Sequence, residues 1–107
     1  MQGFKLSDLA RFDPDKMGKV DLAASPRLRC GLNCFEPGQA QKAHAHAGAD
    51  KLYYVLEGSG EFSVGDERRT LSAGELLHVP ENLPHGVTNT GATRLVTLIV
   101  IAPNPMH

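Results

Sequence analysis

The amino-acid sequence predicts an all-β fold, and two patterns carry that prediction. After residue 19, most of the chain consists of short segments in which apolar and polar residues alternate, as in strands that bury one face. Gly, Pro, Asn and Asp residues separate these segments at intervals of about 8 to 12 residues, which is typical of a β-sandwich or barrel. An architecture of βαβ units is therefore not expected.

Only the start of the chain has a helical pattern, and a short N-terminal helix is expected over Ser7–Phe12 with Ser7 as its cap. Residues 13–19 then have the composition of a turn. The expected strands follow in the segments RLRCGLNCF, KLYYVLEG, GEFSVG, RTLSAG, ELLHVP, HGVTN and RLVTLIVIA. Positions 95–101 are apolar on both faces, so both faces should be covered, either by a second subunit or on one side by the N-terminal segment.

Length and charge limit the classes of function. A chain of 107 residues has room for one domain, expected to span 1–107. The net charge is −1 and the Lys and Arg residues are scattered, so no basic stripe offers a surface to nucleic acid or anionic lipid. The N-terminus has no apolar run of signal-peptide length, and the longest apolar run, Leu95–Ala102, is far short of a membrane span. We therefore expect a cytoplasmic protein with neither nucleic acid nor membrane as a partner.

The two cysteines are expected to be free thiols. Cys30 and Cys34 share one face of an expected strand, where their Cα atoms would lie roughly 13 Å apart at about 3.3 Å per residue. A disulfide needs Cα atoms within about 7 Å. Packing as small hydrophobic residues is the expected role, and lining the inside of a barrel is the alternative.

Three histidines are candidates for a metal site. His44 and His46 are separated by one residue, so in a strand both side chains point to the same side and can chelate one ion. A third ligand must come from elsewhere in the chain. His85 is the natural candidate because it directly follows a turn formed by residues 80–84.

The segments around these histidines resemble the two sequence motifs of the cupin family. The first motif is matched by PGQAQKAHAHAGADKLYYVLEG and the second by GELLHVPENLPHGVTN. The positions that carry the resemblance are Gly38, His44, His46 and Gly58 in the first motif and Gly74, Pro80, His85 and Asn89 in the second.

The resemblance extends from about Arg27 to Pro103, which would be the barrel core. It implies a double-stranded β-helix, the cupin jelly-roll barrel, in which the three histidines converge inside the barrel mouth. Small cupins commonly pair, so a homodimer is also expected.

Two positions depart from the family pattern. Asn82 stands where the second motif usually has Gly, and Asn tolerates the left-handed backbone that such a turn requires. The glutamate ligand of the first motif aligns with Lys51 and not with the neighbouring Asp50. A lysine ammonium group has no free lone pair and cannot coordinate a metal.

Lys51 leaves three interpretations open. Three histidines can suffice, as in the cupin-like thiol and diketone dioxygenases, with Lys51 as an electrostatic or substrate-binding group. A fourth ligand can come from Asp50, which has the wrong strand parity unless a bulge intervenes, or from Gln39 or Gln41. Metal binding can also have been lost, leaving a pocket for an organic ligand.

The function predicted from this site is a mononuclear metal-binding cupin that acts on a small organic substrate. Imidazole ligands suit one divalent transition metal, which can be Fe, Zn, Ni, Cu or Mn. Three histidines leave coordination positions open, so a dioxygenase-like or an isomerase- or lyase-like reaction is expected. Lys51 and Tyr53, which share strand parity, are the candidate catalytic or substrate-orienting groups. The alternative is a non-catalytic binding protein in which a metal is absent or structural.

Overall fold

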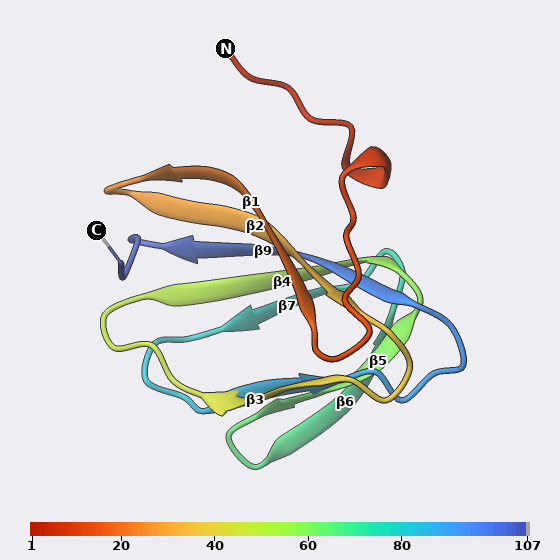
Figure 1. Ribbon diagram of the computed structural model, residues 1–107. Coiled ribbons are helices and arrows are strands. Elements are labelled where there is room, and N and C mark those ends of the chain that lie inside the picture. Colours follow the sequence, from red (N-terminus) through yellow and green to blue (C-terminus); the bar gives the residue numbers. More distant parts are fainter. Residues whose placement is uncertain (107) are drawn as a thin grey trace.

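A computed structural model describes residues 1–106 of the chain. Within them lie one short 3-10 turn and nine strands (Figure 1), with the bounds η1 Leu6–Asp8, β1 Gly18–Ser25, β2 Leu28–Phe35, β3 Ala40–His44, β4 Asp50–Glu57, β5 Ser59–Val64, β6 Glu67–Ser72, β7 Leu76–Val79, β8 His85–Thr88 and β9 Leu95–Ala102. None of the described residues forms a helix with the length and apolarity that a membrane crossing needs.

The strands form two antiparallel sheets. The five-stranded sheet has the order β1-β2-β9-β4-β7, and the four-stranded sheet has the order β3-β8-β5-β6. The last strand therefore lies between β2 and β4, and β8 lies between β3 and β5, so strands distant in sequence alternate across both sheets (Figure 1). The predicted all-β class and the double-stranded β-helix are confirmed.

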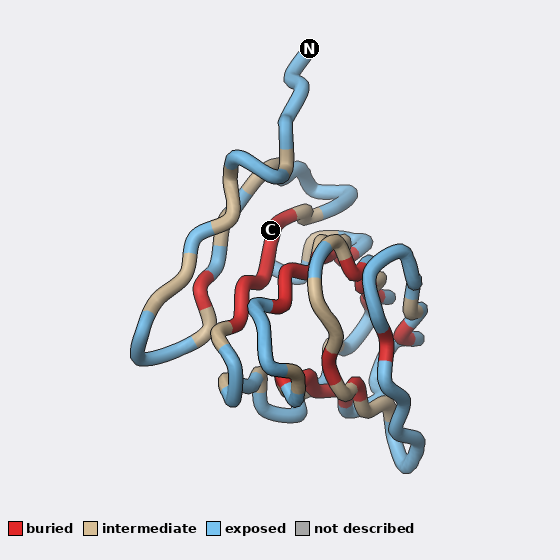
Figure 2. The backbone as a smooth tube through the Cα atoms, turned by 90° about the vertical axis from the view of Figure 1, so that its right-hand side faces the viewer, coloured by how far each residue is buried: buried red, intermediate tan, exposed pale blue. Residues whose placement is uncertain are grey.

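The main hydrophobic core fills the space between the two sheets. Its largest buried side chains are Tyr53, Phe35 and Phe62, which come from strands of both sheets. Figure 2 shows the buried backbone running through the strands, while the first residues of the chain are exposed. This core closes one part of the barrel interior and leaves the remainder free for a site.

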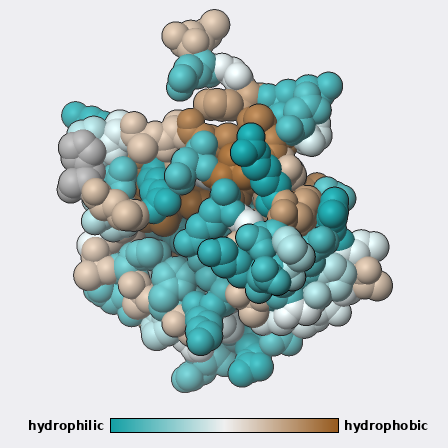
Figure 3. All heavy atoms as spheres, viewed as in Figure 1, coloured by the Kyte–Doolittle hydropathy of each residue, from teal (hydrophilic) through white to brown (hydrophobic). Residues whose placement is uncertain are grey.

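The outer face of the five-stranded sheet carries a second apolar cluster. Leu32, Cys34 and Val96 are buried there, and the N-terminal residues Leu6, Leu9, Ala10 and Phe12 pack against them. Figure 3 shows hydrophobic atoms gathered in this upper region of the molecule, whereas the lower region over β3, β5 and β6 is mostly hydrophilic. The N-terminal segment thus covers the outer face of β9 at Val96. This is one of the two ways in which the apolar positions 95–101 were expected to be covered.

The expected helix over Ser7–Phe12 is wrong. The structure has a three-residue 3-10 turn, Leu6–Asp8, preceded by Lys5, and no side chain caps it. Six residues are too few to stabilise a helix alone, because the first turn is costly to nucleate. Packing of Leu6 and Leu9 on the sheet decides the conformation instead.

Both cysteines are free, as expected. They lie on the outer face of β2 and do not line the barrel, since Cys34 belongs to the outer cluster with Leu32. Burial raises the pKa of both thiols. The opposite face of β2, which carries Arg29 and Asn33, is the one that borders the internal cavity.

Candidate metal centre

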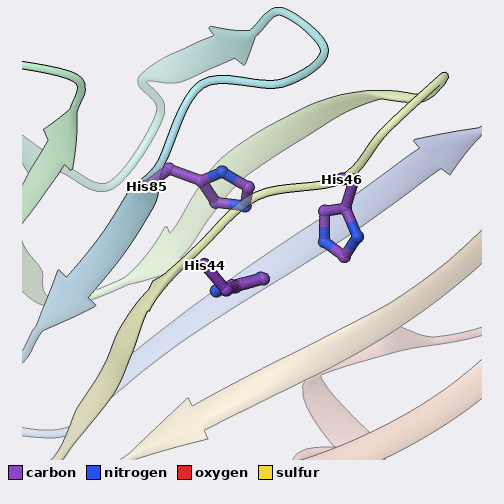
Figure 4. Close-up of side chains that lie close together, drawn as sticks. All are labelled: His44, His46 and His85. Atoms are coloured by element: carbon purple, nitrogen blue, oxygen red, sulfur yellow. The ribbon is translucent and has the colours of Figure 1, made fainter.

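Strand pairing brings the three histidines together. His44 is the last residue of β3 and His85 the first residue of β8, and the two are direct partners in the antiparallel ladder. His46 follows two residues after His44, in the loop that leads to β4. Figure 4 shows the three rings pointing toward a common space, with β9 passing behind them.

The rings are close enough to share one ion. Their centroids are 4.8 Å apart for His44 and His46, 4.3 Å for His44 and His85, and 5.4 Å for His46 and His85. One nitrogen from each ring can be chosen so that all three lie within 4.8 Å of one another. Three such nitrogens can hold a metal ion and leave its remaining positions open.

Backbone carbonyls orient two of the rings. Nδ1 of His85 lies 3.0 Å from the carbonyl oxygen of Leu83, and Nδ1 of His44 lies 3.0 Å from that of Lys42. An Nδ1–H that donates to a carbonyl fixes the tautomer in which Nε2 carries the free lone pair. The hydrogen bonds therefore leave the Nε2 lone pairs of His44 and His85 free to coordinate a metal ion.

The Nε2 atoms of His46 and His85 are buried and have no hydrogen-bond partner among the described residues. A buried nitrogen without a partner is unfavourable, and such groups in a native protein require an explanation. A metal ion bound by these atoms would supply it. The residues present therefore fit a metal ion.

His46 and His85 are also held in the neutral form that a metal ligand needs. Burial lowers the pKa of His85 to about 4, and the nearby histidines and Lys51 act in the same direction. The pKa of His46 is lowered, first by burial and then by the charges of His44 and Lys51. At neutral pH these two rings are unprotonated and can donate to a cation without first losing a proton.

The turn before His85 positions a second histidine as well. Asn82 has a φ of 68°, so the left-handed conformation expected at this departure from the family pattern is present. Its backbone N–H donates to the carbonyl oxygen of His46 at 3.0 Å. The loops that carry His46 and His85 are thereby joined.

Lys51 lies inside the barrel and is 2% exposed. Its backbone pairs with Ile101 on one side and Val79 on the other, and its Nζ stands 4.4 Å from the centre of the Tyr53 ring. Burial, with the charges of Lys19 and Arg29, lowers the pKa of Lys51 to about 8. The group remains mostly protonated at neutral pH and adds positive charge beside the histidines.

Tyr53 is fully buried and connects the core to the site. Its ring packs edge-on against Phe62 at 5.4 Å and against His85 at 6.0 Å. Its hydroxyl donates to Oε1 of Gln41 at 2.9 Å, and burial raises the pKa of the phenol, so the donor is retained. Gln41 borders the cavity beside the histidines and is oriented there by Tyr53.

The other fourth-ligand candidates lie away from the cluster. The Asp50 carboxylate points to the outer face, where it accepts hydrogen bonds from Nε2 of His78 at 2.9 Å and from the backbone of Glu81 at 3.0 Å. Gln39 donates to the carbonyl of Asp13 and accepts from the backbone of Glu36. No bulge reverses the parity of Asp50, because its neighbour Lys51 takes the inward position.

A cavity of about 370 Å³ opens beside the histidines. Its polar lining consists of Lys19, Asp21, Arg29, Asn33, Gln41, His44, His46 and Lys51. Lys19, Arg29 and Asn33 were not among the residues predicted from the sequence to form the site. Strand parity could have indicated Asn33, because it lies on the same face of β2 as the core residue Phe35.

Comparison with known proteins gives this geometry a context. Residues 31–101 match the family described as Cupin domain. The chain is similar to the solved structure of TT1209 from Thermus thermophilus, with a TM-score of 0.95 and 43% identity over 98% of this chain and 100% of that one. An RmlC-like cupin protein from Desulfovibrio desulfuricans aligns with a TM-score of 0.86 and 30% identity over 96% of this chain and 97% of the other.

A curated relative, the oxalate-binding protein of Thermotoga maritima, is 34% identical over 65 residues, which are 61% of this chain and 54% of the relative. The chain spans about half the length of the curated relatives it matches.

Proposed function

The chain belongs to the cupin family, and from that premise we propose that it is a mononuclear metal-binding cupin that acts on a small organic substrate. His44, His46 and His85 would hold the ion through their Nε2 atoms. One observation carries the proposal: the Nε2 atoms of His46 and His85 are buried without a partner among the described residues, next to a third ring in the same small space.

The residues of the chain have separate roles in this proposal. A bound transition metal supplies a Lewis acid, or with iron a centre for oxygen chemistry, at positions that three histidines leave open. The carbonyls of Lys42 and Leu83 hold two rings in the donating tautomer. Tyr53 keeps its proton and orients Gln41 at the cavity wall. Lys51 carries positive charge that a substrate can neutralise.

The reaction class follows from the metal. Iron favours a dioxygenase-like reaction, and zinc, nickel or manganese favours an isomerase- or lyase-like reaction in which a carbonyl or enolate is polarised. Lys51 in place of the family glutamate leaves the site without a carboxylate among its inward-facing candidates.

The first experiment is metal analysis by plasma mass spectrometry on untagged protein purified without a nickel column. We expect about one equivalent of a transition metal per chain, and a loss of that metal in His46→Ala. His78→Ala is the matched control, because His78 lies outside the cluster and is half-exposed. Wild-type protein that stays metal-free after addition of Fe(II), Mn(II) and Zn(II) would contradict the proposal.

The alternative function is non-catalytic binding of a small molecule, and one comparison favours it. A relative from Thermotoga maritima is named as an oxalate-binding protein. Metal-loaded protein that shows no turnover, yet retains an organic ligand through purification, would support this second function. Oxygen uptake with Fe(II) across thiols, diketones and flavonols would support the first.

We further propose that the protein acts as a homodimer in the cytoplasm. The half-exposed apolar outer faces of β4, β7 and β9 support the dimer. Free thiols at Cys30 and Cys34 fit a reducing compartment.

A further inference from the structure

We propose that the cavity beside the three histidines selects small organic acids, and that the carboxylate of the acid lies between Lys51 and Arg29. This inference names the substrate class of the proposed metal centre and rests on that proposed function. The acid would present a second oxygen donor toward the histidines.

The sheet places the two cations in one row. Ile101 of β9 pairs with Arg29 of β2 on one side and with Lys51 of β4 on the other. Arg29 and Lys51 are therefore two strands apart, about 10 Å at roughly 4.8 Å per strand, and both border the cavity. Long side chains that start this far apart on one face can reach a single carboxylate between them. The row runs across β2, β9 and β4, which are neighbours in the five-stranded sheet. In Figure 4, β9 and β2 lie on the side that the histidines face.

Lys51 is the least compensated charge in this part of the molecule. It is 2% exposed, and across residues 1–106 no hydrogen bond or ion pair to its ammonium group is present apart from its contact with the Tyr53 ring. A buried ammonium without a counterion is costly, because desolvation is not repaid by an opposite charge. An anionic ligand would supply the missing charge.

The other charged side chains that border the cavity do not neutralise the positive charge of Lys51. Three cationic side chains border the cavity, Lys19, Arg29 and Lys51, against one carboxylate, Asp21. Asp21 is committed to Arg29 at 3.1 Å and its side chain is 82% exposed at the rim. A divalent metal on three neutral histidines would add further positive charge. The cavity is thus complementary to an anion.

The lining also supplies space and further polar contacts. Gly31, between Arg29 and Asn33, also borders the cavity, and its lack of a side chain lets the Val20 carbonyl of β1 lie close to β2. The amides of Asn33 and Gln41 also border the cavity, where they can donate to oxygen atoms. The volume of about 370 Å³ admits a molecule of a few carbon atoms.

Titration calorimetry on zinc-loaded protein tests the inference. The probes are dicarboxylic acids from malonate to adipate, each compared with its neutral diamide. We expect at least one acid to bind roughly tenfold or more tightly than its diamide, and that preference to be lost in Lys51→Met. Arg29→Gln, at a half-exposed position, should weaken the same acid and provides a second variant if Lys51→Met does not fold. Lys16→Met is the matched control, because Lys16 is exposed and does not border the cavity.

The outcomes separate this inference from the metal centre. Equal binding of acids and diamides, no binding of any acid, or unchanged affinity in both Lys51→Met and Arg29→Gln would overturn the anion subsite even if zinc is bound. If zinc does not bind, the metal centre fails, and the same titration on metal-free protein decides the subsite alone. Binding of an acid that depends on Lys51 would then still support it.

Discussion

Lys51 and His85 are buried to the same extent, 2% exposed each, but they differ in charge at neutral pH: His85 is neutral and Lys51 is mostly cationic. Desolvation lowers both pKa values, because it disfavours the charged form of any base. The pKa of His85 falls to about 4, so the ring is neutral and can coordinate a metal. The pKa of Lys51 falls only to about 8, so the amine stays largely protonated. At the same degree of burial, His85 is therefore a neutral group that can coordinate a metal, and Lys51 remains a cation that can bind an anion.

The buried His85 predicts acid-sensitive stability in metal-free protein. Its pKa is about 4 in the folded state and about 6.5 in the unfolded chain, so between these values the unfolded state binds more protons. The free energy of unfolding should therefore fall as the pH drops from 6.5 to 4, by up to about 3 kcal/mol at about 1.4 kcal/mol per pKa unit. Urea denaturation with a chelator, across this pH range, measures the loss.

Two variants identify the source of that slope. His85→Gln should flatten it, while Lys16→Met, at an exposed position that does not border the cavity, should leave it unchanged. The linkage would be refuted by equal slopes in wild-type protein and His85→Gln. It would also be refuted by a wild-type stability that does not change between pH 6.5 and pH 4.

At the scale of elements, Asn89 joins the two sheets at the end of β8 opposite to His85. It follows β8 and is 1% exposed. Its Nδ2 donates to the carbonyls of Phe35, at the end of β2, and Thr93, before β9, at 3.0 and 2.9 Å. Its Oδ1 accepts from the backbone of Gly91 at 3.0 Å. Every polar atom of this side chain is thus used to fix the positions of strands.

Asn89→Ala should lower the free energy of unfolding by about 3 kcal/mol, because buried backbone groups lose their partners at about 1 to 3 kcal/mol each. Thr90→Ala, at the exposed neighbouring position, should change it by less than about 0.5 kcal/mol. Chemical denaturation gives both values. Metal content measured well below the unfolding transition should stay at the wild-type level, and a loss of metal from folded Asn89→Ala would assign the residue to the metal site instead.

Apart from β3, the strands from β2 onward were predictable because their alternation has the period of a pleated sheet, as in Lys51, Tyr53 and Val55. The strand β3, Ala40–His44, was not expected as a segment, because AQKAH contains no large apolar residue. The strand β1, Gly18–Ser25, was not expected, because Val20 and Leu22 are its only large apolar residues. Periodicity also does not say which face of a strand is inside. Arg29 borders the cavity and Cys30 lies outside, the reverse of what hydropathy alone favours. That choice depends on strand order, which is a property of the whole sheet.

At the scale of the whole molecule, the five-stranded sheet carries charged side chains on its cavity face and an apolar patch on its outer face. Inside the five-stranded sheet, the row Arg29, Ile101 and Lys51 borders the cavity. Outside it, an outer patch remains beyond the reach of the N-terminal segment, and we define it as Leu52, Tyr54, Leu76, Leu98 and Val100. Strand pairing makes this patch continuous, because Tyr54 is the direct partner of both Leu98 and Leu76.

The outer patch predicts that the protein forms a dimer through this sheet face. Leu76 is 59% exposed and Tyr54 is 36% exposed, which is unfavourable for large apolar side chains that adjoin one another in water. A second copy can bury the same patch by two-fold symmetry. Sedimentation velocity at micromolar concentration should show a dimer, and Leu76→Glu should weaken it roughly tenfold or more, because a charge would be buried against the partner.

The control for this dimer is a second exposed apolar residue that lies outside the outer patch. Phe4→Glu alters such a residue and should leave the dimer intact. A wild-type monomer, or a dimer that tolerates Leu76→Glu, would mean that this face is not the interface. Since the cavity opens on the opposite face of the sheet, Leu76→Glu should retain wild-type metal content even as a monomer.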